Sequence, residues 1–336
     1  MRTISKRPGR VTRAMALLAL VTVAPLVGPS AQAGAAGADR TAGTDRTAGA
    51  AGAVHREATA TLAVPTGTLT SMTGAAGQGR VRGTVDLPGH VGVLAVRAVV
   101  GGLPHDVTHS VSGTGPRAFD TPFTISVTAN PPICVHAFDG AAWQQIGTCL
   151  HTAVGWSNSM TGGPAPSGRL LGVAKVPGWS GTLAVRAVVN GVPQPSVLTT
   201  GGGTDYQPFS APFTLTGALS SRSVCLQGNS YGYWHPMGPC RWTATGTFAG
   251  MSGTSGSGTA AGVVTMTNWW DYPIQVRVTV DGVIDPESYR YSAGGTGNRA
   301  YSAPFRASAT ASHTVCVQAN SHGYWNQLGC RTRPAA

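Results

Sequence analysis

The segment VCLQGNSYGYWHPMGPC (residues 224–240) encloses an aromatic stretch between two cysteines, and the chain contains this pattern three times. Its counterparts are ICVHAFDGAAWQQIGTC (133–149) and VCVQANSHGYWNQLGC (315–330), and the first cysteines of successive copies are 91 residues apart. Repetition at a fixed period indicates an architecture made of copies of one unit. The three copies therefore set how the rest of the sequence is divided.

A second block recurs with nearly the same period, as LAVRAVVGG (94–102), LAVRAVVNG (183–191) and IQVRVTVDG (274–282), whose first residues are 89 and 91 positions apart. Apolar and polar residues alternate in it, which is typical of a half-buried β-strand. In the third copy the apolar positions are Ile274, Val276, Val278 and Val280. The pairs Asn190-Gly191 and Asp281-Gly282 come next, and such pairs tolerate the positive φ angles of a type I′ hairpin turn.

These signals predict an all-β protein with three tandem Ig-like antiparallel β-sandwich domains, each with one internal disulfide. Only 10% of the residues are charged and 47 are glycine, a composition that suits strands joined by tight turns. The predicted segments are a signal peptide (1–33), a flexible Ala/Gly/Thr-rich tail (34–65) and repeats 1 (66–151), 2 (152–243) and 3 (244–336). The short joints HTAVG (151–155) and TATGT (243–247) predict limited freedom between repeats.

The first residues predict export. MRTISKRPGRVTR has five basic residues and no acidic one, and an apolar stretch follows that ends at the small-x-small pattern Ala31-Gln32-Ala33. No later stretch approaches the roughly 18 apolar residues of a spanning helix, so we expect a secreted protein without integral membrane association. Without the signal, 18 Lys and Arg face 12 Asp and Glu, and the positive charges are scattered. The charge pattern therefore argues against nucleic acid as a partner.

The tail has two predicted properties. Residues 34–53 contain almost no apolar side chain larger than alanine, which predicts a flexible tether. Residues 58–64 (ATATLAV) alternate weakly, and could add as an edge strand to repeat 1 or to another protein.

Six cysteines in an exported chain, two in each copy, predict disulfides within the repeats. The expected pairs are Cys134–Cys149, Cys225–Cys240 and Cys316–Cys330. Closing a loop of this length stabilises a domain by roughly 3 kcal/mol. A zinc site is disfavoured because there is no C-x-x-C, and because His136, His235 and His322 do not share one repeat position. We expect no metal and no other cofactor.

The third copy resembles a repeat of exported actinobacterial proteins. The resemblance rests on VTMTNWWDYPIQVRVTVDG (264–282) and ASHTVCVQANSHGYWNQLGC (311–330), which carry a tryptophan segment, a V-x-V-x-V-D-G hairpin and an H-x-V-C…L-G-C block. Repeat 2 matches fairly well, and repeat 1 less well because His90 replaces the tryptophan. The resemblance implies an Ig-like β-sandwich accessory module that is not catalytic and has no assigned ligand.

Motifs for catalysis are weak. GNSYG (228–232) matches the G-x-S-x-G pattern of a nucleophilic serine, but it lies in a predicted hairpin rather than at a strand-to-helix turn. The equivalent residues in the other copies are FDGAA and ANSHG, so the match is not repeated. Twelve acidic residues in the whole chain offer little for paired-carboxylate chemistry. We predict that the protein is not an enzyme.

Aromatic residues between the cysteines are the candidate binding residues, because their rings offer large contact areas at low entropic cost. The candidates are Trp143, Tyr231, Tyr233, Trp234, Tyr324 and Trp325. The alternative is that they fill the core of a small sandwich. The neighbouring Trp269 and Trp270 cannot both face inward on one strand, so one of them should be exposed.

The predicted function is a secreted, non-catalytic, multi-domain binding or scaffold protein at the cell envelope or in an extracellular assembly. Its partner would be an exported protein or a cell-wall glycan. Alternatives are an adaptor subunit of a secreted antagonism complex and a secreted inhibitor of a hydrolase. A hydrolase is the least favoured reading.

Overall fold

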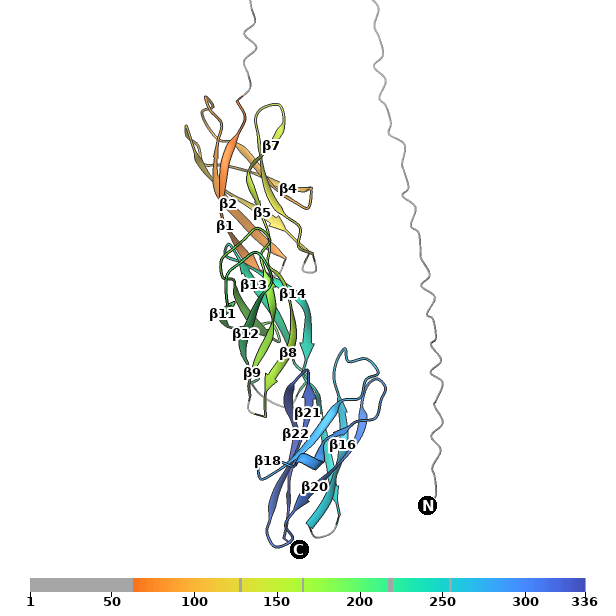
Figure 1. The fold of residues 1–336 in the computed structure, drawn as a ribbon. Helices are drawn as coiled ribbons and strands as arrows, with labels where there is room; N and C mark the ends of the chain where they lie inside the picture. Colours follow the sequence, from red (N-terminus) through yellow and green to blue (C-terminus); the bar gives the residue numbers. More distant parts are fainter. Residues whose placement is uncertain are drawn as a thin grey trace, which may run out of the picture. The chain divides into compact units, whose positions relative to one another are not determined.

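The computed structural model describes residues 63–75, 77–126, 129–164, 166–216, 220–253 and 256–335 (Figure 1). The described residues form β-strands and a single short 3-10 turn, η1, with no α-helix among them. This confirms the predicted all-β fold. The predicted signal peptide and nearly all of the tail lie outside the described residues, and β1 begins directly after them, at Thr66.

Repeats 1 and 2 have the same seven strands in the same order. In repeat 1 these are β1 (Thr66–Ala75), β2 (Gln78–Asp86), β3 (Ala95–Val100), β4 (Leu103–His109), β5 (Arg117–Thr124), β6 (Ile133–Phe138) and β7 (Trp143–Leu150). In repeat 2 they are β8 (Val154–Gly162), β9 (Ser167–Lys175), β10 (Ala184–Val189), β11 (Val192–Leu198), β12 (Gln207–Thr214), β13 (Ser223–Ser230) and β14 (Tyr233–Trp242).

Repeat 3 differs only in its fourth strand, which is broken into two pieces around η1. Its elements are β15 (Thr245–Ser252), β16 (Gly256–Thr265), β17 (Gln275–Val280), β18 (Val283–Ile284), η1 (Pro286–Ser288), β19 (Arg290–Tyr291), β20 (Arg299–Ala307), β21 (His313–Ser321) and β22 (Tyr324–Arg333).

Each repeat folds as an Ig-like sandwich of a three-stranded and a four-stranded antiparallel sheet. In repeat 1 the sheets are β1-β2-β5 and β4-β3-β6-β7, and the pairing recurs in repeats 2 and 3. Two parallel bridges join sheets of successive repeats: β1 meets β14 at Ala75 and Trp234, and β8 meets β22 at Gly162 and Tyr324. The sheets of neighbouring repeats are therefore hydrogen-bonded to one another.

Each sandwich has its own hydrophobic core, formed by alternate residues of its strands. Ile274, Val276 and Val278 are buried as the two-residue period predicts. The outward face of β17 is also covered, since Arg277 and Thr279 are buried. The ring of Trp325 covers Arg277, so this face of the strand is not open to solvent.

The predicted hairpin turns are present. Asn190 and Asp281 have φ of 48° and 52°, and the glycines after them have φ of 83° and 81°. Repeat 1 makes the corresponding turn with Gly101 at 56° and Gly102 at 87°. Positive φ at both central positions is the property of the type I′ turn that the sequence indicated.

Candidate binding surfaces

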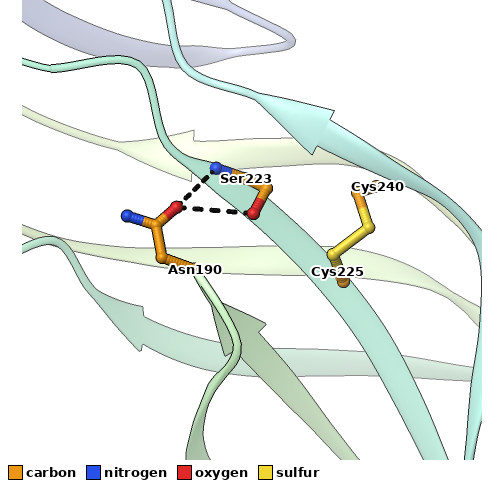
Figure 2. The surroundings of a disulfide bond; sticks show 4 residues. All are labelled: Asn190, Ser223, Cys225 and Cys240. Carbon is orange, nitrogen blue, oxygen red and sulfur yellow. Dashed lines mark hydrogen bonds between the residues drawn. A yellow bond between two sulfur atoms is a disulfide. The ribbon is translucent and has the colours of Figure 1, made fainter. Parts of the chain in front are cut away.

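The disulfides join the strands that flank the aromatic stretches. The bonds are Cys134–Cys149, Cys225–Cys240 and Cys316–Cys330, with Cα–Cα distances of 4.2, 4.1 and 4.0 Å. This confirms the predicted pairing, and each repeat contains its own bond. Figure 2 shows the turn beside Cys225–Cys240, where the Asn190 carboxamide oxygen accepts from the Ser223 amide at 3.0 Å and from its hydroxyl at 3.4 Å. In repeat 3 Asp281 accepts in the same way from the Thr314 amide at 2.8 Å.

Each tryptophan between the cysteines lies on the outward face of the four-stranded sheet under an arginine. The guanidinium carbons of Arg97, Arg186 and Arg277 lie 4.1, 4.0 and 4.0 Å from the ring centroids of Trp143, Trp234 and Trp325. Such cation–π contacts are worth about 0.5–2 kcal/mol. The arginine in LAVRAVV and its relatives is therefore the partner of the tryptophan in the cysteine block.

Two of these stacks are held by a further hydrogen bond. Arg186 Nε donates to Gln227 Oε1 at 2.9 Å, and Arg277 Nε donates to Gln318 Oε1 at 2.8 Å. Each half-buried indole has one face covered by a guanidinium, so that face is not open to a ligand. The three tryptophans thus lie outside the hydrophobic cores, each with one face against a guanidinium.

In repeats 2 and 3 the tyrosine before the tryptophan enters the core of the preceding repeat. Tyr233, in repeat 2, is fully buried and belongs to the hydrophobic core of repeat 1. Its ring lies 5.4 Å from that of Phe123, and its hydroxyl accepts from the Gly77 amide at 3.1 Å. The carbonyl of Tyr231 accepts from the Met72 amide at 2.7 Å.

The same contacts recur between repeats 2 and 3. Tyr324 is 2% exposed and belongs to the core of repeat 2, with its ring 5.5 Å from Phe213. The carbonyl of His322 accepts from the Met160 amide at 2.8 Å. We call the Asn-Ser-x-Gly-Tyr-Trp hairpin tips at 229–234 and 320–325 the plugs. The sockets that receive them are Met72, Gly79 and Phe123 in repeat 1, and Met160, Gly168 and Phe213 in repeat 2.

A glycine and an asparagine shape each plug. Gly232 and Gly323 have φ of 100° and 101°, and a Cβ there would lie 2.4 and 2.3 Å from the carbonyl oxygens of Met72 and Met160. The Asn229 side chain accepts from the Gly232 amide at 3.0 Å, with its counterpart in repeat 3 at 2.7 Å. Only glycine permits both this backbone conformation and this approach.

Each joint contains a histidine, fully buried at the first and partly buried at the second. Burial lowers the pKa of His235, which is 0% exposed beside Tyr233. At the second joint, burial and the nearby Arg241 guanidinium lower the pKa of His322 to about 4. The Nη1 of Arg241 lies 2.7 Å from the His322 Nδ1 and its Nε donates to the Ser157 hydroxyl at 2.8 Å, so this arginine links three segments of the joint.

The most exposed aromatic side chains among the described residues lie in repeat 3, in the loop that precedes β17 and in β19. Trp270 is 80% exposed and Tyr272 is 71% exposed. Tyr291, which lies in β19 and pairs with Gln275 of β17, is 68% exposed. Trp269 is half-buried and its Nε1 donates to the Tyr272 carbonyl at 2.8 Å. The prediction that one of the paired tryptophans is exposed is therefore confirmed.

The backbone of this loop is fixed from below by Arg299, which is 2% exposed. Its Nη2 donates to the carbonyls of Trp269 and Trp270, both at 2.8 Å, and its Nη1 donates to that of Tyr272 at 3.1 Å. A further bond from Nε reaches the Gly295 carbonyl. Charge-assisted bonds of this kind are about twice as strong as neutral ones, so the loop is preorganised although its aromatic side chains face solvent.

The sequence predicted that Trp269 or Trp270 is exposed, without showing which, and gave no sign of the rest of this surface. Tyr272 and Tyr291 lie outside the cysteine blocks that supplied the candidate binding residues. The role of Arg299 recurs in the other repeats. Arg117 and Gln207, at the same place in repeats 1 and 2, are also buried and also donate to loop carbonyls.

The described residues offer little for catalysis. Ser230 is buried at the end of β13, and its hydroxyl has no hydrogen-bond partner among them, so the G-x-S-x-G match lacks an adjacent base. No group of three or more His, Cys, Asp or Glu in this part of the chain could hold a metal ion. No helix in it is long and apolar enough to cross a membrane.

Comparisons with known proteins identify similar solved structures but no family. No family model matches the chain, and no curated protein matches it. Similar solved structures include the FN1-FN3 domains of chicken CNTN1 (7% identity, TM-score 0.19, 81% of this chain and 99% of that one). Others are the I9-I11 tandem of titin (11%, TM-score 0.20, 79% and 98%) and the BSP domain of a biofilm associated protein (7%, TM-score 0.20, 83% and 68%). At these TM-scores the likeness assigns the chain neither a family nor a ligand.

Proposed function

We propose that the protein is a secreted, non-catalytic scaffold of three joined β-sandwiches that binds cell-wall glycan through the aromatic loop of repeat 3. The observation that carries the proposal is the exposure of Trp270 and Tyr272 on a backbone clamped by Arg299. Exposed aromatic rings on a rigid support present large, flat, partly polar contact areas, which suit stacking against a sugar ring.

The rest of the chain supports a scaffold role. The joint residues Thr152, Ala153, Thr243 and Ala244 are buried, and a tyrosine from the following repeat completes the core of the preceding one. This construction holds the repeats to one another and buries Tyr233 and Tyr324, the tyrosines of the two aromatic stretches. Repeat 3 then presents the open surface.

Export is part of the same proposal. Three disulfides with no free cysteine among the described residues fit an oxidising compartment, since such bonds are rare in a reducing cytosol. The basic and apolar N-terminal sequence supplies the signal for export.

A co-sedimentation experiment tests the proposal. The mature full-length chain is mixed with insoluble peptidoglycan or with insoluble cell-wall polysaccharide, and the bound fraction is measured by centrifugation. We expect saturable binding that falls at least tenfold in Trp270→Ala, with a smaller loss in Tyr272→Ala. The matched control is Trp156→Ala, which removes a 44% exposed tryptophan from repeat 2 and should leave binding unchanged.

Binding that survives Trp270→Ala would contradict the proposed surface. Equal losses in Trp270→Ala and Trp156→Ala would also contradict it, because the loss would then follow aromatic content rather than the loop.

A further inference from the structure

Repeat 3 has the same socket residues as repeats 1 and 2, at the same register positions. In the first two repeats a socket glycine pairs with a socket phenylalanine, as Gly79 with Phe123 and Gly168 with Phe213. In repeat 3 Gly258 pairs with Phe305. A Cβ on any of the three glycines would strike the phenylalanine ring at 2.4–2.6 Å, so the ring lies directly against the glycine in each repeat.

The methionine of the third socket is uncovered. Met72 and Met160 are 0% exposed because a plug lies over them, whereas Met251, the third methionine in the series, is only half-buried. The amides of Met72 and Met160 donate to plug carbonyls at 2.7 and 2.8 Å. No such carbonyl from another repeat reaches Met251 within the described ranges. The plug contacts of the first two sockets are thus missing from the third, where Phe305 is 2% exposed and the Arg333 guanidinium carbon lies 5.6 Å from its ring centroid.

We propose that the third socket (Met251, Gly258 and Phe305) binds the hairpin tip of a separate exported polypeptide. That tip would have the chemistry of the plugs: a turn glycine with positive φ, then a tyrosine whose ring replaces the Arg333 guanidinium against Phe305. The chain itself closes two such sockets with the same residues, Tyr233 in repeat 1 and Tyr324 in repeat 2. The inference is independent of the glycan surface, because Trp270 and Tyr272 are not part of the socket.

A second copy of this chain lacks the matching tip. Repeat 1 has Asp139-Gly140-Ala141-Ala142 where the plugs have Ser-x-Gly-Tyr. Ala141 stands at the place of the plug glycine, where a Cβ would collide with the socket backbone. Ala142 stands at the place of the tyrosine. Repeat 1 therefore has no plug to offer to the third socket of another copy, so the partner must bring its own plug.

A gain-of-function variant tests the socket with the full mature chain. Phe138→Asn, Asp139→Ser, Gly140→Tyr, Ala141→Gly and Ala142→Tyr together give repeat 1 the plug of repeat 2. We expect this graft to form head-to-tail assemblies at tens of micromolar, seen by sedimentation velocity as masses that are multiples of the chain and grow with concentration. Adding Met251→Lys should return the mass to that of the wild type.

If the graft does not fold, binding of a disulfide-closed plug peptide to the wild-type chain tests the same socket. The probe is residues 224–240 with Cys225–Cys240 closed and a fluorescent label, titrated into the wild-type chain. We expect saturable binding that weakens at least tenfold with Met251→Lys in the chain or Tyr233→Ala in the peptide. Retention of cooperative melting by the Met251→Lys chain is the control for folding.

Three outcomes overturn the inference. These are a folded graft that keeps the wild-type mass, peptide binding indifferent to both substitutions, and wild-type self-association that Met251→Lys abolishes, which would make the occupant a second copy. The proposed glycan function fails separately, because it is read from Trp270→Ala on peptidoglycan, where Met251→Lys should bind as the wild type does.

Discussion

The two joints of the molecule use the same plug but different surroundings. Tyr233 and Tyr324 enter equivalent sockets, at ring distances of 5.4 and 5.5 Å from Phe123 and Phe213. At the first joint the Tyr233 hydroxyl accepts from the Gly77 amide, and a buried histidine, His235, lies beside the ring. The second joint adds Arg241, which bonds to Ser157 and contacts His322. The comparison indicates that the apolar plug is the common requirement and that the polar bonds set how firmly each joint is closed.

The largest effect is expected from removing a plug. Tyr233→Ala should cost about 3–5 kcal/mol, the usual range for deleting a large aromatic side chain from a core. The loss should appear in repeat 1, whose core the ring completes, although the residue belongs to repeat 2. Hydrogen exchange of the β1–β2 hairpin by mass spectrometry measures it, with Tyr233→Phe as the matched control that loses only the bond to Gly77.

Tyr324→Ala sharpens the comparison. Exchange in the β8–β9 hairpin should rise less than exchange in β1–β2 does in Tyr233→Ala, because the Arg241 bonds at the second joint remain. Equal increases would show that the polar bonds add nothing. An increase confined to repeat 2 in Tyr233→Ala would show that the ring does not support repeat 1.

The plug glycines should give the next largest effect, and the two joints should respond alike. Gly232→Ala and Gly323→Ala each place a Cβ within 2.4 Å of a backbone oxygen while holding φ near 100°. We expect a loss of about 2 kcal/mol or more at either joint, read from exchange in the hairpin of the preceding repeat. Gly191→Ala is the control, since its φ of 83° is equally unusual but its Cβ would meet no atom within 4 Å. A loss no greater than in this control would mean that the close approach is unimportant.

Local patterns in the sequence predicted the repeats, the strands, the turns and the disulfides, because each depends on residues close together in the chain. Ile274, Val276 and Val278 show their buried face by alternation alone. The joints could not be predicted in this way, since the hydroxyl of Tyr233 meets the amide of Gly77, 156 residues earlier. The arginine–tryptophan stacks were within reach, because Arg97, Arg186 and Arg277 keep one place in the LAVRAVV block and the tryptophans that they cover keep one place in the cysteine block. What the sequence lacked was the register that places the two on adjacent strands.

Arg241→Ala separates the joints more selectively. It removes the bonds to Ser157 and the contact with His322, and we expect a loss of about 2 kcal/mol at the second joint, the range of hydrogen bonds from a charged group. Exchange in β8–β9 should rise while exchange in β1–β2 stays at the wild-type level. Arg241→Lys, which keeps the charge but not the planar fork, should recover only part of the loss. A rise in both hairpins would contradict the assignment of Arg241 to one joint.

The smallest effect concerns pH. In the folded chain the pKa of His322 is lowered from 6.5 to about 4, so the unfolded chain binds a proton first as the pH falls. The stability that depends on neutral His322 is thus fully present above about pH 6.5 and is lost as the pH falls toward 4. Because the side chain is partly exposed, we expect a loss of only about 1 kcal/mol at pH 5. Burial lowers the pKa of His235 as well, which gives the first joint a sensitivity of the same sign.

Replacing each histidine by the residue that the other joint has at the same position tests this pH dependence. His322→Tyr installs the counterpart of Tyr231, and His235→Asn installs the counterpart of Asn326. Between pH 7.5 and 5, the rise in exchange of β8–β9 should be smaller in His322→Tyr than in the wild type, and that of β1–β2 smaller in His235→Asn. If each substitution instead reduces the acid-induced rise in exchange equally in both hairpins, the two histidines act through one shared unfolding step. The joints would then not open independently.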